Sequence, residues 1–376
     1  MRTITSAVLI ILIALPASTT PTIIVNRMDS ELESFRIVRV ASGINHPWSI
    51  AFLPDSTALI SERSGGLLRL DLHSGKLQNL SGAPIVTAIG QGGLLDIEPH
   101  PRFLDNRLIY LSYVTGRSGA YTTGIVRGRL TDSGLTDLEV IFTMNRPSGG
   151  RVHFGSRLMF GNDGMLYATL GDRGERHRAQ DPNDHAGTII RLRDDGTIPL
   201  DNPFANGESS AAPEVYSFGH RNPQGLAVHP MTGRLWAHEH GPQGGDEINV
   251  IDAGVNYGWP VITFGTEYRT GAAIGIGTDA PGMVQPVLHW TPSIAPSGMT
   301  FYTGNSFPAW RGHLFAGALA GRHLRRVEFD GEQAVAEEIL LEDLVGRIRD
   351  VKQGPNGMLW VLEDARRGSI YRLEPI

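Results

Sequence analysis

Short apolar runs separated by turn residues cover most of the chain, and no stretch after the first twenty residues is both long and helically periodic. One unit recurs: an apolar strand, a turn rich in proline, asparagine, aspartate or glycine, and a second apolar strand. Copies are predicted at residues 50–61, 95–113, 158–169, 226–238, 298–317 and 351–362. The pattern therefore predicts six similar β-hairpins and an all-β fold.

Six copies of one hairpin favour a six-bladed β-propeller with one sheet per copy. A strand pair cannot bury its apolar face alone, so each sheet must be covered by its neighbours. A β-sandwich with coincidental turn signals is the alternative, but a sandwich does not require six similar hairpins. The 46 glycines and 23 prolines among 376 residues fit many tight turns. We expect residues 35–376 to form a single propeller domain whose loops meet at one end of a central channel.

The first twenty residues have the order of a secretory signal peptide. Arg2 is a short basic start, residues 7–15 are apolar, and residues 17–20 are small. A membrane anchor is the alternative, although the apolar run is shorter than the ~20 residues that a spanning helix needs. We expect residues 1–20 to be removed and residues 21–34 to be a loose leader. The mature protein is then periplasmic or secreted, without stable membrane insertion.

Charge and cysteine content narrow the function classes. The formal net charge of −6 gives no electrostatic reason to expect nucleic acid as a partner. The chain has no cysteine, which excludes disulfides, a lipid-modified cysteine and covalently bound haem. The sequence also lacks a zinc-type ligand cluster and a phosphate-binding loop, because residues 90–93 are glycine-rich without the ending that such a loop has.

A histidine between glycines is the first candidate for chemistry. His153 lies in the segment 150–157, just before the third hairpin, and Asp172 follows the second strand of that hairpin. A carboxylate in contact with an imidazole raises its basicity and fixes its tautomer, as a general base requires. The alternative is that His153 is an ordinary packing or surface histidine.

Three arginines form the second candidate. Arg221 and Asn222 precede Pro223 in a rigid turn, and this pair suits an anionic ligand that carries carbonyl groups. A turn in which Asn222 caps its own backbone is the alternative. Arg347 and Arg349 alternate along an expected strand, so both side chains point to one side. Two guanidiniums on one face repel each other unless carboxylates or an anion lie between them; a solvated edge is the alternative.

Residues 239–260 are too bent for a helix and too polar for a core strand. They combine many glycines and prolines with Asp246 and Glu247. Calcium takes roughly six to eight oxygen ligands in flexible geometry, and many of these are main-chain carbonyls. The stretch is therefore a candidate calcium-binding loop.

Several motifs in one order resemble the soluble, pyrroloquinoline quinone (PQQ)-dependent aldose sugar dehydrogenases, the soluble glucose dehydrogenase family. The likeness spans roughly residues 40–374, and its motifs are residues 45–48, 91–94, 153–157, 171–172, 219–225, 239–242, 245–249, 256–260, 295–297 and 347–350. That family has a six-bladed propeller fold, which agrees with the repeat count reached from the hairpins alone.

The resemblance implies PQQ as cofactor. PQQ is a flat tricarboxylate, so Arg347 and Arg349 would bind its carboxylates. Arg221 would lie beside the reactive carbonyl and stabilise the oxyanion that forms there. The implied cofactor-binding residues are Gln91, Arg221, Asn222, Ser293, Arg347 and Arg349.

The resemblance also implies an aldose as substrate and calcium as second cofactor. His153 would take the proton from the anomeric hydroxyl while C1 passes hydride to the quinone, and Asp172 would orient the imidazole. One calcium ion would polarise the quinone carbonyl, and a second would pin the loop. The implied metal-binding residues are Gly241, Pro242, Glu247 and Tyr257.

The chain departs from the best-known glucose dehydrogenase branch at three places. Residues 317–320 read Gly-Ala-Leu-Ala where that branch has a lysine that contacts PQQ, and Arg322 or Arg326 is the expected replacement. Val152 stands where that branch has an acidic residue, and His240 stands in place of a glutamine. These differences place the chain nearer the broad-specificity aldose branch, with an electron acceptor that the sequence does not identify.

Two other functions stay open at this point. Six-bladed propellers also host calcium-dependent lactonases, which use carboxylates and amides around a channel calcium and need no anion-binding arginines. Arg347 and Arg349 argue against that function. The other alternative is a non-catalytic propeller that binds sugars or proteins, because a fold does not by itself determine function.

Overall fold

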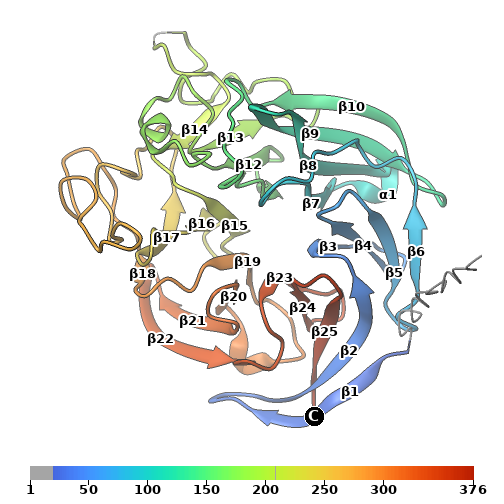
Figure 1. Ribbon diagram of the computed structural model, residues 1–376. Helices are drawn as coiled ribbons and strands as arrows, with labels where there is room; N and C mark the ends of the chain where they lie inside the picture. Colours follow the sequence, from blue (N-terminus) through green and yellow to red (C-terminus); the bar gives the residue numbers. More distant parts are fainter. Residues whose placement is uncertain (1–19, 208) are drawn as a thin grey trace, which may run out of the picture.

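The computed structural model describes residues 20–207 and 209–376, so the expected signal peptide lies outside the described residues apart from Thr20. The described chain forms six antiparallel sheets arranged in a ring (Figure 1). The prediction of an all-β, six-bladed propeller is confirmed. Its helical turns are short: α1 (Phe103–Asn106), η1 (Arg176–Gln180) and η2 (Pro308–Trp310).

The first three blades each contain four consecutive strands, here in chain order. Blade 1 consists of β3 (Pro47–Phe52), β4 (Thr57–Glu62), β5 (Leu67–Asp71) and β6 (Leu77–Leu80). Blade 2 consists of β7 (Leu94–Pro99), β8 (Leu108–Arg117), β9 (Ala120–Leu130) and β10 (Leu135–Thr143). Blade 3 consists of β11 (Leu158–Phe160), β12 (Leu166–Leu170), β13 (Thr188–Leu192) and β14 (Val215–Phe218).

The last three blades include the two ends of the described chain. Blade 4 consists of β15 (Pro223–Val228), β16 (Leu235–Glu239), β17 (Asp246–Ile251) and β18 (Leu288–Trp290). Blade 5 consists of β19 (Pro296–Phe301), β20 (Leu314–Ala318), β21 (Leu324–Asp330) and β22 (Gln333–Leu340). Blade 6 consists of β23 (Ile348–Gln353), β24 (Leu359–Glu363), β25 (Gly368–Pro375), β2 (Ser34–Ile44) and β1 (Thr22–Asp29), from the centre outward.

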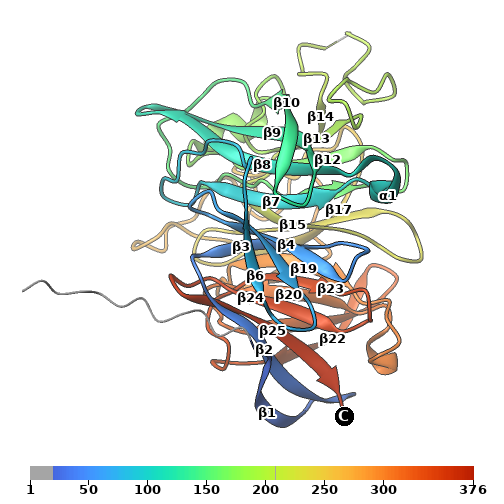
Figure 2. The same cartoon turned by 90° about the vertical axis from the view of Figure 1, so that its right-hand side faces the viewer.

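Blade 6 closes the ring. Its strand β2 pairs with β25, and these first and last parts of the chain, blue and red, lie side by side in Figures 1 and 2. The expectation of a loose leader over residues 21–34 is wrong for Thr22–Asp29, which form β1 and pair with β2. Val25 and Met28 of β1 also pack against the apolar cluster between blades 5 and 6. Main-chain hydrogen bonds and two partly buried side chains thus hold a segment whose other residues face solvent.

Each predicted hairpin forms the two innermost strands of its blade. In Figure 1, β3, β15, β19 and β23 lie near the centre of the ring, and β6, β10 and β22 lie at its rim. Every residue of β12, β16 and β20 is buried, so neither face of these strands reaches solvent, and most of their residues are apolar. The outer strand β22 instead alternates between exposed and half-buried positions.

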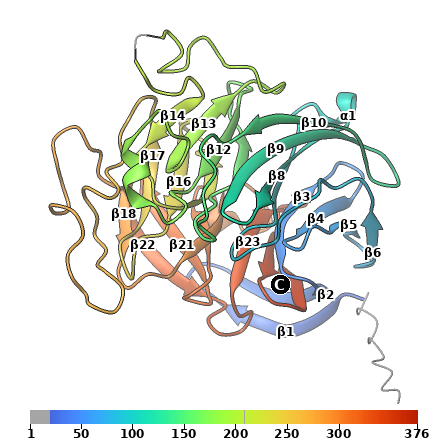
Figure 3. The ribbon, with the colours of Figure 1, turned by 45° about the horizontal axis from the view of Figure 1, so that its top comes forward.

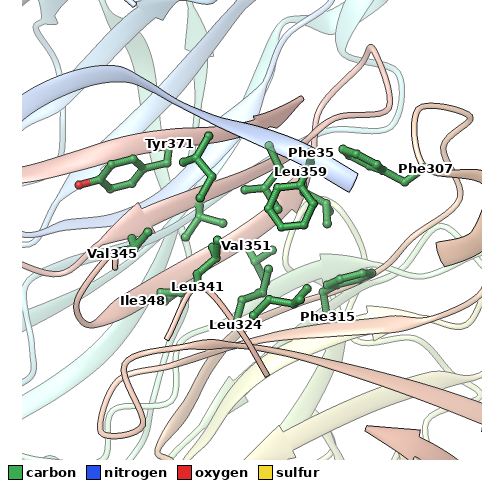
Figure 4. Close-up of a cluster of buried hydrophobic side chains, with 14 of the residues drawn as sticks. Phe35, Phe307, Phe315, Leu324, Leu341, Val345, Ile348, Val351, Leu359 and Tyr371 are labelled. Carbon is green, nitrogen blue, oxygen red and sulfur yellow. The ribbon is translucent and has the colours of Figure 1, made fainter. Parts of the chain in front are cut away.

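Apolar clusters fill the space between adjacent blades. The cluster between blades 5 and 6 includes Phe35, Phe307 and Phe315 (Figure 4), and the rings of Phe35 and Phe307 meet edge to face with centroids 6.3 Å apart. Comparable clusters join the other neighbouring blades. Burial of apolar surface contributes about 25 cal/mol per Å², so the ring is held together chiefly by contacts between neighbours.

A buried arginine ties three blades together at the centre. Arg157, 1% exposed, precedes β11 of blade 3. Its Nη1 lies 2.9 Å from Oδ1 of Asp96 on β7 and 3.3 Å from Oδ1 of Asp350 on β23. Both carboxylates are fully buried. This ion-pair triad lies below the cavity described next.

One end of the propeller carries both the loops that enter the innermost strands and the loops that leave the second strands. These two sets of loops share an end because the two strands of each hairpin run antiparallel. The long segment between β17 and β18, yellow-orange in Figure 3, projects from the ring. Within the described part of the chain, no helix has the length and apolar character needed to cross a bilayer.

Candidate active site

A cavity of about 250 Å³ opens among these loops. All six blades contribute to its wall, represented by Arg63, Gln91, Phe154, Asn222, Leu319 and Arg347. Sites for cofactors and other small molecules commonly measure ~300–1,000 Å³, so the cavity suits one compact ligand. Four residues predicted to bind a cofactor, Gln91, Asn222, Arg347 and Arg349, lie in this wall.

His153 and Asp172 are in contact beside the cavity. Nδ1 of His153 lies 2.6 Å from Oδ1 of Asp172. The second oxygen of Asp172 accepts a hydrogen bond from the indole N–H of Trp259 at 2.8 Å, and the main-chain N–H of Gly174 donates to the first. The carboxylate engages Nδ1, and this leaves Nε2 as the nitrogen that can accept a proton from a bound molecule.

The segment that carries His153 is bent and held by its neighbours. His153 has φ = 54° and Gly155 has φ = 61°, both in the left-handed region. The main-chain N–H of His153 donates to Oε1 of Gln91 at 2.8 Å. A Cβ atom on Gly171 would lie 2.1 Å from the carbonyl oxygen of His153, so only glycine permits this approach.

Arg173 fastens the same segment. Its guanidinium donates hydrogen bonds to the carbonyls of Gly150 and Val152, and it stacks on Phe154 with 3.3 Å to the ring centroid. Arg173 is 1% exposed, and no carboxylate of the described chain forms an ion pair with it. Burial, together with the charge of Arg178, lowers the pKa of Arg173 to about 9.

The electrostatic surroundings keep His153 neutral. Burial lowers the pKa of His153 below 6.5, and the positive charges of Arg221 and Arg173 act in the same direction, while Asp172 opposes them. Burial opposes the charge of Asp172, but its contacts with His153, the Gly174 N–H and Arg221 together lower the pKa of this carboxyl. Near neutral pH the pair is therefore a neutral imidazole beside a carboxylate, the state that a general base requires.

Arg347 and Arg349 share one face and reach the cavity, as their alternation predicted. Nη1 of Arg349 donates to Oε1 of Gln224 at 2.9 Å, and Nη1 of Arg347 donates to the carbonyl of Leu319 at 3.1 Å. Each guanidinium also has a nitrogen 3.6 Å from Oδ2 of Asp364. A single carboxylate thus faces two guanidiniums.

Asn222 links separate loops and does not cap its own turn. Its Oδ1 accepts a hydrogen bond from the main-chain N–H of Gly155 at 3.1 Å. Its Nδ2 lies 3.4 Å from Nδ1 of His240, whose Nε2 donates to the carbonyl of Pro296 at 2.6 Å. Blades 3, 4 and 5 are joined in this way at the cavity wall.

Arg221 lies behind Asn222, beside a second and much smaller cavity. Its Nη1 donates to the carbonyls of His240 and Gly241 at 3.1 and 3.3 Å, and its guanidinium is 5.4 Å from the ring centroid of Trp259. Glu239 accepts the main-chain N–H of Arg221. The buried guanidinium is therefore fixed at the start of the bent stretch that follows β16.

The expected calcium loop is organised by Asp246. Its carboxylate accepts hydrogen bonds from the N–H of Gly241, the hydroxyl of Ser293 and two further main-chain N–H groups. The carbonyl of Gly241 accepts from Arg221, and the carbonyl of Pro242 accepts from the N–H of Thr266 at 3.0 Å. A main-chain carbonyl has two lone pairs, so each of these oxygens retains one for a cation.

Glu247 faces another carboxylate. Glu239 and Glu247 are paired across β16 and β17, and both line the small cavity beside Arg221. Burial, reinforced by the charge of Glu239, raises the pKa of Glu247 to about 8. Two acids side by side, one buried and one half-buried, are costly unless a proton or a cation lies between them, and their oxygens are ligands that calcium prefers.

The hydroxyl of Tyr257, a residue of the predicted metal set, is engaged by main-chain groups and not by Glu247. Its hydroxyl donates to the carbonyl of Val250 at 2.7 Å and accepts from the N–H of Asp252, and its ring stacks on His220. Only a main-chain oxygen of Tyr257 is free for such a role. Across the described residues, no three His, Asp or Glu side chains surround a common point.

Three further predicted positions lie away from the cavity. Ser293 does not line the cavity, and its hydroxyl donates a hydrogen bond to Asp246. Arg322 is half-exposed and pairs with Asp343. Arg326 is buried in blade 5, where it pairs with Glu338. Neither arginine replaces the missing lysine, because neither reaches the cavity wall.

Several residues at the site did not emerge from sequence patterns. Trp259 and Gln224 lie inside the motifs 256–260 and 219–225, next to residues with predicted roles, and that proximity was a usable signal. Arg63 and Asp364 follow second strands of hairpins, and their position at the cavity end could be derived from the propeller alone. Glu239 ends a second strand and begins the motif 239–242, but no role was assigned to it.

Comparison with known proteins finds similar sequences and structures over most of the chain. The family model described as "Glucose / Sorbosone dehydrogenase" matches residues 44–372. Aldose sugar dehydrogenase YliI of Escherichia coli is 43% identical over 88% of this chain and 91% of its own. The apo-form crystal structure of the soluble E. coli aldose sugar dehydrogenase aligns with a TM-score of 0.87 at 41% identity, covering 91% of this chain and 100% of the other. The PQQ-bound aldose sugar dehydrogenase of Streptomyces coelicolor aligns with a TM-score of 0.74 at 30% identity, covering 95% and 99%.

Proposed function

The chain belongs to the glucose/sorbosone dehydrogenase family, and from that premise we propose that it uses PQQ and calcium to oxidise aldose sugars at the anomeric carbon to the lactone. It acts as a periplasmic or secreted oxidoreductase and passes the electrons to an acceptor that is not yet identified. The observation that carries the proposal is the combination, at one cavity, of guanidiniums in excess of carboxylate with an adjoining imidazole–carboxylate pair.

The cavity wall fits an anionic cofactor. Burial lowers the pKa of Arg349 to about 10, and the charges of Arg157, Arg347 and Arg63 act in the same direction, against the single charge of Asp364. Buried cations that repel each other are costly, and a polycarboxylate would relieve that cost. Gln91 and Asn222 add polar side chains to the same wall, and Trp48 and Leu95 add an apolar surface for a flat ring.

Each of four residues of the chain would have a separate role in the proposed oxidation. When bound, PQQ supplies a quinone carbonyl that accepts hydride. Nε2 of His153 takes the proton from the anomeric hydroxyl, and Asp172 holds the ring in the tautomer that leaves this nitrogen free. Arg221, a fixed buried cation, stabilises negative charge on an oxygen placed near it. Trp259 holds the second oxygen of Asp172 in place.

Calcium fits the oxygens beside Arg221. The residues that would hold it are the carbonyls of Gly241 and Pro242, with Glu247 and the main-chain oxygen of Tyr257 at a second position. Glu239 adds a carboxylate that the predicted metal set did not include. A bound divalent cation would neutralise the facing pair of acids and polarise a ligand carbonyl as a Lewis acid.

Reconstitution tests the proposal directly. Purified apoprotein mixed with PQQ and calcium is expected to reduce an artificial electron-acceptor dye when aldoses are added. The electrons that the sugar gives up as hydride would pass through the cofactor to the dye. Omitting either PQQ or calcium should abolish the dye reduction. If PQQ titration produces no change in absorbance and the protein instead hydrolyses lactones in calcium alone, the proposal is wrong.

The pH dependence follows from the surroundings of His153. Its pKa lies below 6.5, so the base is already neutral at neutral pH and kcat/KM should fall only as the solution becomes more acidic than that value. The variant Arg173→Gln removes a nearby positive charge, so the pKa of His153 rises and the acidic limb moves to higher pH. Initial rates measured from acidic to mildly alkaline pH, for wild type and variant, give the two midpoints. Identical midpoints would contradict the assignment of this limb to His153.

A further inference from the structure

A third arginine lines the cofactor cavity, outside the motifs that mark the family but next to two of them, residues 45–48 and 91–94. Arg63 follows β4 of blade 1 and lines the same cavity as Arg347 and Arg349. Because the lysine found in the glucose dehydrogenase branch is missing here, Arg347 and Arg349 provide only two cations for the three carboxylates of PQQ. Arg322 and Arg326 lie outside the cavity, so the third cation must come from elsewhere in the wall.

The backbone of Arg63 is fixed at two points. Its N–H donates to the carbonyl of His46 at 3.1 Å, and its carbonyl accepts the N–H of Leu94 at 3.2 Å. Gly93 has φ = 155°, and a Cβ atom there would lie 1.8 Å from the carbonyl oxygen of Arg63 and 2.9 Å from its Cγ. The loop that carries Gln91 therefore packs directly against the stem of Arg63, which restricts where the guanidinium can go.

The guanidinium of Arg63 has no partner of its own in the described chain: its side chain makes neither a hydrogen bond nor an ion pair. Its positive charge nevertheless affects the titration of a nearby carboxyl. It lowers the pKa of the Asp364 carboxyl, together with Arg349, His46 and Arg347 and against the effect of burial. Half-buried and unpaired, Arg63 has all its N–H donors available for a ligand.

We propose that Arg63 is the third carboxylate-binding guanidinium of the cofactor cavity, completing with Arg347 and Arg349 a set that matches a tricarboxylate. The inference rests on the proposed PQQ function and adds a residue to it. A guanidinium presents several donors in a planar fork that suits a carboxylate. Arg63 would therefore supply the charge of the missing lysine from another blade and with a different hydrogen-bonding geometry.

Asp364 is the positioning residue of this set. Its carboxylate accepts from Nδ1 of His46 at 2.7 Å and lies 3.6 Å from both Arg347 and Arg349. It follows β24, and its N–H donates to the carbonyl of Arg347 at 2.8 Å. The single carboxylate of Asp364 thus holds Arg347 and Arg349 near each other but neutralises only one positive charge. The remaining positive charge is available to a ligand.

Binding of PQQ itself, without turnover, tests the inference. In calcium-containing buffer, PQQ is titrated into apoprotein and the dissociation constant is measured by calorimetry or by quenching of tryptophan fluorescence, since Trp48 lies in the cavity wall. We expect Arg63→Gln to weaken PQQ binding about 10–100-fold, the usual effect of losing a charged hydrogen-bonding group. Arg63→Lys, which keeps the charge but not the fork, should bind with intermediate affinity.

Arg322→Gln is the matched control, because it removes a guanidinium that lies outside the cavity, and PQQ affinity should stay at the wild-type value. The melting temperature of ligand-free Arg63→Gln should equal that of wild type, because the side chain has no internal partner; only the stabilisation by PQQ should shrink. Wild-type affinity in Arg63→Gln, with PQQ bound normally by the parent protein, overturns this inference alone. Absence of PQQ binding by the wild-type protein overturns the proposed function, and this inference with it.

Discussion

Replacing His153 with alanine is expected to lower kcat with aldoses by ~10²–10⁴-fold while leaving the affinity for PQQ near the wild-type value. In the proposed function the imidazole removes the anomeric proton, and its Nδ1 is in contact with Asp172. The side chain of His153 does not line the cofactor cavity, so its loss should not weaken cofactor binding. Stopped-flow measurement of cofactor reduction, combined with a PQQ titration, separates the two quantities.

His177→Ala is the control for that experiment, because His177 is an exposed histidine on η1 close to the same loops. It should retain wild-type kcat and PQQ affinity. Wild-type turnover in His153→Ala would remove His153 from the chemistry, even if the protein proves to be a PQQ enzyme. Parallel losses of turnover and PQQ affinity would instead assign His153 to cofactor binding.

The fold was predictable because its information is local and repeated. Residues 50–61 and 351–362 each carry an apolar strand, a turn and a second apolar strand, and both proved to be the innermost strand pair of a blade. Only an arrangement in which neighbouring sheets cover each other buries six such pairs. The strand Thr22–Asp29 was missed because most of its residues face solvent, so its place depends on pairing with β2, which no local pattern encodes.

The site was predictable where its residues lie in dense motifs. His153, Asp172, Arg347 and Arg349 were found in that way, and the structure brings each pair together. Arg63 and Asp364 come from blades 1 and 6, about three hundred positions apart, and meet only because β2 closes the ring. Arg63 shortly precedes Gly65 and Gly66, and Asp364 lies in a charged segment, residues 363–367. Such patterns are common in turns, so only the three-dimensional arrangement relates these two residues to the cavity.

The cavity and the centre of the propeller are physically connected. Arg349 donates to the side-chain oxygen of Gln224, and the main-chain carbonyl of Gln224 accepts Nε of Arg157 at 3.0 Å. Asp350, which adjoins Arg349 on β23, is an ion-pair partner of Arg157. The orientation of Arg349 therefore depends on the buried triad, and if Arg349 binds the cofactor as proposed, a change in that triad should affect both stability and PQQ affinity.

Arg157→Met is accordingly expected to reduce the free energy of unfolding by ~3–5 kcal/mol, the usual result of removing one partner from a buried ion pair. Methionine fills much of the space but leaves Asp96 and Asp350 buried without a cation. Burial already raises the pKa of Asp350 and the charge of Arg157 lowers it, so the pKa of Asp350 rises further in the variant; this carboxyl is then protonated in acid, and the loss of stability grows as the pH increases. Denaturant unfolding of ligand-free protein at two pH values measures both effects.

Arg27→Met serves as the control, because Arg27 pairs with Asp29 on the exposed face of β1 and a solvent-exposed pair contributes little. Its unfolding midpoint should match the wild type at either pH. Equal stability of Arg157→Met and wild type would mean that the triad is dispensable to the ring, and that apolar contacts between blades suffice. A destabilised Arg157→Met that also binds PQQ more weakly, while Arg27→Met does neither, would support the coupling through Gln224.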